Sequence, residues 1–343
     1  MLLSLSAVNV FAQSSLIATL SHEGEITAFY GADALKEAHE AAAHGDAITL
    51  SSGTFIATNI TKAITLRGAG MQVDTINNVL PTIISGNFEI EIPENTTERL
   101  LIEGIYHNHD IFVCGVLTQA LFQKCRFSRF TSNNRTNGKI VNSSFMHCYI
   151  SSVLCLTGAG SDCSIINSII CSPEFFDGYA DGSSMQFANS IVLTIKVPYR
   201  HYLSYLGNCS FNNCIIVGSN GGGSGSVNVD YLPSTCSAYN CVAMNCRLDN
   251  CFHNIPNTTN KHSTYTKVFK DFTGKYNDDT TFELTDEAKA KFLGTDDTQV
   301  GIYGGNFPYD PTTTNPHITK CNVAAKSTAD GKLSVDIEVA GVE

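Results

Sequence analysis

The chain has 343 residues and a formal net charge of −11 at pH 7, and 15% of its residues are charged while 43% are hydrophobic. This composition disfavours a helical bundle, whose wet faces use Lys, Glu and Arg, and favours stacked strands joined by polar turns. The negative charge argues against nucleic acid or an anionic membrane as a partner, because both need clustered Lys and Arg. A polyanionic substrate would need a local basic site or bridging cations. No transmembrane segment is expected, since no apolar run reaches the ~18 residues that span a bilayer.

The first residues form a short apolar segment. Residues 1–12 are rich in Leu, Ser, Ala and Val and end in Val10, Phe11 and Ala12 before Gln13. A short apolar run with this small-x-small-like end resembles the end of a secretory signal peptide, although the positively charged opening region is missing. We interpret it as a signal-peptide remnant, which predicts a secreted or cell-surface protein. The alternative is a buried first strand.

The next segment, 32–44, is rich in Ala. It carries Asp33 near its start, places Leu35 on the same face as several alanines, and is followed by Gly45. These features predict a helix with a defined beginning and end. In a stack of strands, such a helix would cover the open end, which otherwise exposes apolar side chains and unpaired strand edges.

Short strand-like segments follow the predicted helix. They lie at 48–55, 64–70, 83–88 and 101–106 and are less regular than the segments after them. Directly behind the last one, His107 and His109 are two residues apart and adjoin Asp110. Two histidines at this spacing on a strand would point to one face, which makes His107, His109 and Asp110 a weak candidate metal site. The alternative is a pair of solvated loop histidines.

Six later segments share one pattern: 120–127, 143–150, 163–170, 185–192, 209–216 and 236–243. A first apolar position holds Phe122, Phe145, Ile165, Phe187, Phe211 and Ala238. A second closes each unit with Phe127, Ile150, Ile170, Val192, Ile216 and Ala243. Apolar and polar residues alternate with the period of a strand. The segments recur every 20 to 27 residues along their Cys/Ser position, which is typical of a solenoid, and they lack the leucine framework of leucine-rich repeats.

Between the two apolar positions lie a polar position and a Cys/Ser position. The polar position holds Lys124, His147, Asn167, Asn189, Asn213 and Asn240. The next residue is Cys125, Cys148, Ser168, Ser190, Cys214 or Cys241. Successive coils of a parallel β-helix stack about 4.8 Å apart, so equivalent residues lie over one another. We expect the apolar residues inside, and the Asn residues at left-handed turns with hydrogen bonds to the coils above and below.

The chain has 13 cysteines, an odd number. Their recurrence beside the polar turn favours reduced thiols packed in the core over a disulfide framework. Cys236, Cys241, Cys246 and Cys251 are five residues apart. Zinc sites usually pair cysteines two to four residues apart, which disfavours a metal site there.

Three insertions after the second apolar position are the best places for a ligand, because long loops overhang the binding groove of such a fold. Together they place carboxylates, aromatic rings, an Arg and a His on one flank. The candidate groove residues are Asp177, Tyr179, Asp181, Tyr199, Arg200, His201, Tyr202, Asp230 and Tyr231. Aromatic rings stack on sugar faces, and a carboxylate with Arg or His can act as acid, base or charge stabiliser. Asp177 and Asp181 precede glycines and fit ordinary turns equally, and residues 199–202 fit a cover for the apolar side of the stack.

The tail has a different pattern. Residues 261–310 follow the coils and are expected to form a C-terminal cap region. In 311–343, two alternating segments flank Ala329, Asp330 and Gly331, a hairpin signal. This part is interpreted as a strand pair or a surface-anchoring tail.

Residues 33–38, 45–50, 53–55 and 64–70 together resemble the beginning of the pectin-lyase-like superfamily of right-handed β-helices. With the repeated coils, the resemblance covers roughly residues 30–255. Residues 294–305 resemble the closing segment of β-helix proteins exported by gut Bacteroidota. The resemblance implies an all-β, right-handed parallel β-helix over 13–260, with an N-terminal capping helix and a small C-terminal β tail. It implies no activity, because the superfamily holds enzymes of several kinds, adhesins and phage spikes.

The enzymatic motifs of that superfamily do not map onto the chain. The Arg-x-Pro-x-x-Arg pattern of pectate lyases is absent, as is the ordered set Asn-Thr-Asp, Asp-Asp, Gly-His-Gly and Arg-Ile-Lys of galacturonases. Asp278-Asp279 and Asp296-Asp297 lie beyond the coils. The sequence therefore predicts a monomeric, exported β-helix that binds a polysaccharide without a named cofactor, with Ca²⁺ left open. The alternative is a polysaccharide lyase or glycoside hydrolase acting in the groove lined by the loops after residues 170, 195 and 217.

Overall fold

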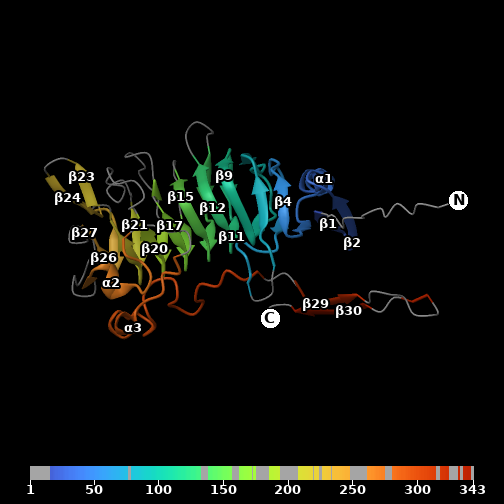
Figure 1. Ribbon diagram of the computed structural model, residues 1–343. Coiled ribbons are helices and arrows are strands. Elements are labelled where there is room, and N and C mark those ends of the chain that lie inside the picture. The colour runs from blue at the N-terminus through green and yellow to red at the C-terminus, as the bar shows by residue number, and fades with distance from the viewer. Residues whose placement is uncertain are drawn as a thin grey trace.

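The computed structural model confirms a right-handed parallel β-helix, drawn as a long stack of coils in Figure 1. The structure describes residues 16–75, 79–132, 138–156, 162–171, 173–174, 185–193, 208–218, 220–223, 226–232, 234–247, 261–274, 280–313, 317–323, 331–332 and 335–340. Residues 1–12, interpreted as a signal-peptide remnant, lie outside these ranges. None of the helices in the described residues is long and apolar enough to cross a bilayer.

Two long sheets form the body of the stack. Sheet A runs in the order β2 (Glu25–Tyr30), β1 (Ile17–His22), β3 (Ala47–Leu50), β5 (Thr65–Arg67), β8 (Leu101–Glu103), β11 (Leu121–Gln123), β14 (Ser144–Met146), β16 (Cys163–Ile166), β19 (Met185–Ala188), β21 (Cys209–Asn212) and β25 (Ser237–Tyr239). Sheet B runs in the order β28 (Lys261–His262), β26 (Val242–Met244), β22 (Ile215–Val217), β20 (Ile191–Leu193), β17 (Ile169–Cys171), β15 (Tyr149–Leu156), β12 (Arg126–Ser132), β9 (Ile105–Val113), β6 (Thr82–Ser85) and β4 (Gly53–Ile56). Apart from the antiparallel pairs that β1 makes with β2 and β3, the neighbours are parallel.

Shorter pairs lie beside these sheets. They are β7 (Phe88–Ile90) next to β9, β18 (Pro173–Glu174) next to β15, β10 (Val116–Thr118) with β13 (Lys139–Val141), and β23 (Asn220–Gly223) with β24 (Ser226–Tyr231) and β27 (Cys246–Arg247). In the tail, β29 (His317–Val323) pairs antiparallel with β30 (Val335–Ala340), which confirms the predicted β tail.

The predicted registry of the coils is confirmed residue by residue. Phe122 pairs with Phe145, and the same column continues to Ala238. The second apolar column likewise runs in register from Phe127 to Ala243. Rings one coil apart stack, with centroids 4.9 Å apart and planes at 15° for Phe122 and Phe145. Stacked apolar columns therefore fill the interior.

The polar column lies at a turn with left-handed backbone, as predicted. The six residues from Lys124 to Asn240 have φ between 43° and 55°. Their side-chain partners differ from the expectation. Asn167 Nδ2 donates to the carbonyls of Ile302 and Gly304, each at 2.8 Å, rather than to the coils above and below. The reason is that a later segment of the chain lies along this edge and offers backbone carbonyls to the side chain.

The Cys/Ser column has a hydrogen-bonding role that explains its composition. Ser168 Oγ donates to the carbonyl of Ile166 at 2.8 Å, and Cys148 Sγ approaches the equivalent carbonyl of Met146 at 3.4 Å. Burial raises the pKa of the Cys148 thiol to about 12, so it remains a donor. The cysteines of this column are free thiols, which confirms the reduced state predicted for them.

The N-terminal end is covered by α1 (Ala34–Ala41), within the predicted range 32–44. Leu35 is fully buried in the same cluster as Ile48 and Phe55 of the first coil. The helix is docked by its histidine: the His39 ring accepts a hydrogen bond from the backbone N–H of Thr61 at 3.2 Å. Burial lowers the pKa of His39 to about 4, which keeps the ring neutral and able to accept.

The C-terminal part of the chain folds back on the outside of the stack. After β28 come α2 (Tyr265–Val268) and α3 (Asp286–Lys291), whose buried residues pack on the outer face of sheet B in a second apolar cluster. Residues 294–313, called the strap here, then run along the turn edge towards earlier coils (Figure 1). The strap needs glycine where it touches the coils: a Cβ on Gly301 would lie 2.8 Å from Ile215 Cδ1.

Candidate functional site

The outward column of sheet B defines the site. It runs in register through Tyr106, Arg126, Tyr149, Ile169, Ile191, Ile215 and Val242. From Arg126 onwards, each member is the residue that follows a Cys/Ser position. The aliphatic members are buried under the C-terminal cluster. Tyr106 and Arg126 lie beyond that cover and are only partly buried. A cavity therefore begins where the column changes from aliphatic to aromatic and cationic side chains.

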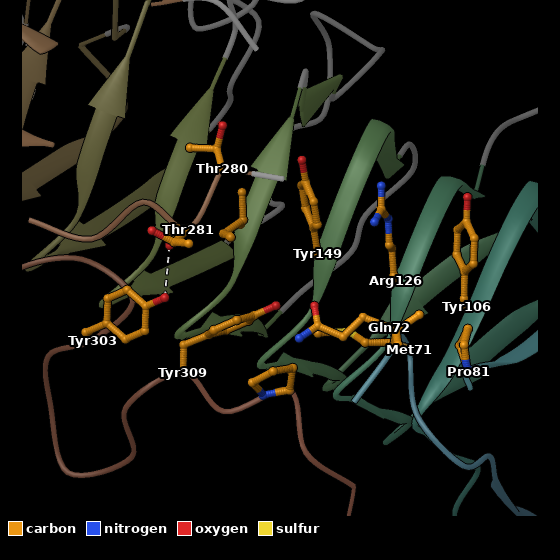
Figure 2. A pocket seen from close by; sticks show the side chains of 13 residues that line it. Met71, Gln72, Pro81, Tyr106, Arg126, Tyr149, Thr280, Thr281, Tyr303 and Tyr309 are labelled. Atoms are coloured by element: carbon orange, nitrogen blue, oxygen red, sulfur yellow. Dashed lines mark hydrogen bonds between the residues drawn. The ribbon is translucent and has the colours of Figure 1, made fainter. Parts of the chain in front are cut away.

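Arg126 lies between two tyrosine rings. Its guanidinium carbon is 5.1 Å from the ring centroid of Tyr106 and 5.1 Å from that of Tyr149. Figure 2 shows the three side chains side by side on neighbouring strands. A guanidinium over a tyrosine face is attracted by the ring quadrupole, so each ring restrains it. This tyrosine–arginine ladder is consequently a rigid part of the cavity.

The strap and two loops form the other walls. The strap contributes Tyr303, Tyr309 and Pro311, and the remaining lining residues are Met71, Gln72, Val73, Pro81, Ile169, Thr280 and Thr281. The cavity holds about 570 Å³. It adjoins a smaller cavity of about 200 Å³ that shares Gln72, Val73 and Pro311 and extends to Thr313. The two cavities form one groove that follows the strap.

The tyrosines on the strap are neutral hydrogen-bonding groups. Tyr303 donates its hydroxyl to the carbonyl of Thr281 at 2.9 Å (Figure 2), and the backbone N–H of Tyr309 donates to the carbonyl of Ile302 at 2.7 Å. Burial raises the pKa of both phenols. The described lining thus offers aromatic faces, hydroxyls, the Gln72 amide and one guanidinium, a set suited to binding a polyhydroxylated ligand.

Most of the loop residues predicted from the sequence lie outside the part of the chain that the structure describes, so their place in the groove stays a prediction. Asp177, Tyr179, Asp181, Tyr199, Arg200, His201 and Tyr202 lie outside the described residues. Asp230 and Tyr231 belong to β24, where they are paired with Cys246 and Arg247 of β27.

The two histidines of the weak metal candidate lie in different environments. His107 is fully buried, because it occupies the inner column between Ile84 and Phe127. Its Nε2 lies 2.8 Å from the carbonyl of Gly86, and burial lowers its pKa to about 4. His109 is exposed, since the register shifts between it and β12. Their rings are 6.3 Å apart, but no group of three potential metal ligands occurs among the described residues.

Asp110 takes part in a surface contact. Its Oδ2 lies 3.9 Å from a guanidinium nitrogen of Arg129 on the next coil, and both side chains are substantially exposed. An exposed pair at this distance contributes little to stability. We therefore assign His107 to the core and leave His109 and Asp110 as surface residues.

Sequence reasoning missed the tyrosine–arginine ladder, although a signal was present. The column one residue after the Cys/Ser position reads Arg126, Tyr149, Ile169, Ile191 and Ile215. An outward column of aliphatic residues indicates a covered surface, and its replacement by Tyr and Arg marks where the cover ends.

No protein-family model, curated protein or solved structure matches this chain. The functional argument therefore depends on the groove itself.

Proposed function

We propose that the protein binds a polysaccharide in the groove lined by the tyrosine–arginine ladder. The observation that carries this proposal is the pair of tyrosine rings that flank one arginine inside a cavity of about 570 Å³. Tyrosine rings give large apolar contact area at low entropic cost and suit the apolar faces of sugar rings. The fixed guanidinium adds several donors in a planar fork, which suits hydroxyl or carboxylate oxygens.

The dimensions of the groove favour a chain over a single sugar. Tyr106 and Tyr149 lie on strands two coils apart, which corresponds to about 10 Å along the axis. The smaller cavity continues the groove past Gln72 and Val73 towards Thr312 and Thr313. An extended ligand parallel to the axis would contact both tyrosines and then reach the Thr hydroxyls.

A binding role requires no chemistry in the groove. A glycosidase uses two carboxyl groups at a defined separation, whereas the described lining of the groove carries one carboxylate, Asp74 in the smaller cavity, besides apolar, aromatic, hydroxyl, amide and guanidinium groups. We propose a non-catalytic binding module of the pectin-lyase-like type, exported to the outside of the cell or to its surface. The resemblance at residues 33–70 and the apolar segment 1–12 support these two further proposals.

Retention on a panel of plant and host glycans tests the proposal. The unmodified protein should be retained by at least one polysaccharide, and Tyr106→Ala or Tyr149→Ala should weaken binding about tenfold through the lost stacking. Tyr239→Ala is the matched control, because Tyr239 is a 37% exposed tyrosine on sheet A. Equal retention of all variants, or no retention of the unmodified protein, would contradict the proposal.

Two further readouts separate the alternatives. Release of reducing ends or unsaturated products from the retained polysaccharide would show that the protein is a polysaccharide-cleaving enzyme and not a non-catalytic binding module. Tyr199→Ala and Tyr202→Ala test the loop residues that the sequence predicts as groove residues.

A further inference from the structure

The polar turn column has a second role beyond the turn itself. Its side chains reach outward and hold the strap at successive points. The recorded contacts join Asn213 to Thr295, Asn167 to Ile302 and Gly304, His147 to Phe307, and Lys124 to Asp310 and Thr312. The order of the strap residues is the reverse of the order of the coils. The strap is therefore fastened at four of the coils along this edge.

Two members of the column depart from Asn at the point where the strap borders the groove. His147 Nε2 lies 3.0 Å from the carbonyl of Phe307, two residues before Tyr309, and its ring centroid is 6.2 Å from that of Tyr309. Lys124 Nζ lies 3.3 Å from Asp310 Oδ2, directly after Tyr309, and also donates to the carbonyl of Thr312. The Lys124 side chain is 12% exposed and that of Asp310 is 47% exposed, so the lysine end of this ion pair is shielded from solvent while the carboxylate end is not.

These contacts bracket the tyrosine that forms the groove wall. Tyr309 lies between the two fastening points, and Pro311 follows it. If either point opens, the strap should shift relative to Arg126 and Tyr149, because the other bonds between the polar column and the strap in the described residues, at Asn167 and Asn213, lie several residues earlier in the strap. The geometry points to Lys124 and His147 as positioning residues that fasten the strap and thereby shape the polysaccharide groove. The effect of these two residues on glycan binding rests on the proposed function, whereas their role in fastening the strap does not.

Amide hydrogen exchange tests the fastening without any ligand. Lys124→Met and His147→Phe remove the donors and keep side chains of similar size. In the double variant, the amide of Tyr309 should exchange roughly thirtyfold faster or more, as expected for the loss of a charged and a neutral hydrogen bond. The amides of β14 should be unchanged. Lys36→Ala, which removes an exposed lysine of α1, is the matched charge control.

Rescue distinguishes a positioning role from general damage. With Asn in place of Phe at position 147, His147→Asn should keep the exchange of Tyr309 as slow as in the unmodified protein. The reason is that Asn167 in the next coil holds the strap from the same column position. On the polysaccharide retained by the unmodified protein, the double variant should bind about tenfold more weakly, and His147→Asn alone should bind normally.

Unchanged exchange at Tyr309 in the double variant would overturn the fastening role. Faster exchange with undiminished glycan retention would overturn the link to the groove. If the unmodified protein retains no glycan, the proposed function fails, and exchange alone then decides whether Lys124 and His147 fasten the strap.

Discussion

The outer face of sheet B has two halves that share a backbone and differ in chemistry. Towards the C-terminus the column is Ile169, Ile191, Ile215 and Val242, and the folded-back chain buries it. Towards the N-terminus it is Tyr106, Arg126 and Tyr149, and it lines the groove. At the boundary, Tyr149 and Ile169 are both buried in the covered cluster and both line the groove. Both halves have the same parallel register. The residue type in this column therefore changes from aliphatic to aromatic and cationic where the covered surface gives way to the groove.

A charge introduced into the covered half should have the largest effect. Ile191→Asp places a carboxylate under Gly301 and the C-terminal cluster, and an unpaired buried charge should lower the free energy of unfolding by about 4 kcal/mol or more. Urea denaturation measures the loss. Tyr106→Asp, in the same column of the open half, should cost about 1 kcal/mol or less, and equal losses would remove the distinction between the halves.

The inner column offers a comparison based on pH. The folded-state pKa of His107 is lowered by burial from 6.5 to about 4. The neutral ring therefore contributes stability that is fully present above pH 6.5 and is lost as pH falls towards 4, by about 3 kcal/mol at most. His107→Phe, which restores the residue type of Phe127 in this column, should reduce that loss in urea midpoints measured from pH 7 to 4. The exposed His109→Phe should leave it unchanged, and identical pH profiles for both variants would contradict the assignment.

Glycan binding by the open half should depend on the planar shape of the Arg126 guanidinium as well as on its charge. Arg126→Lys keeps the charge but loses the planar group between the two rings, and it should weaken glycan retention about tenfold with little change in stability. Full retention by the Lys variant would show that charge alone is recognised.

The smallest effect is expected at the Cys/Ser column that underlies both halves. Cys148→Ser should change the unfolding free energy by about 1 kcal/mol or less, because Ser168 makes the equivalent hydrogen bond in the next coil. A large loss in urea denaturation would show that sulfur packing, rather than hydrogen bonding, determines this column.

The stack of coils could be predicted because its information is local and repeated. Columns such as Phe122 to Ala238 recur in the sequence at nearly constant spacing, and a dry interior requires them to lie in register. The helix over 32–44 followed from its apolar face and flanking turn residues. For His107 the sequence left open a strand face shared with His109 or a loop, because the early coils are irregular, and only the register of β9 with β6 and β12 places it in the inner column.

The groove could be predicted only in part. The outward column is visible in the sequence, but two of its walls come from residues 71–81 and 303–311, far from the ladder along the chain. The fold-back of the strap depends on contacts such as His147 with Phe307, 160 residues apart. No local pattern in the sequence marks such a pairing. The sequence instead predicted that the Asn side chains bond to neighbouring coils, whereas the Asn167 side chain bonds to the strap.

The chain contains no tryptophan, which permits a direct measurement at the groove. Tyr149→Trp introduces a single fluorescent ring beside Arg126 and keeps an aromatic face for stacking. Titration with the polysaccharide that the unmodified protein retains should give a saturable change in its emission, while Tyr239→Trp on sheet A should show none. Undiminished binding of that polysaccharide with no change at position 149 would place the ligand elsewhere and contradict a sugar-binding groove at the tyrosine–arginine ladder.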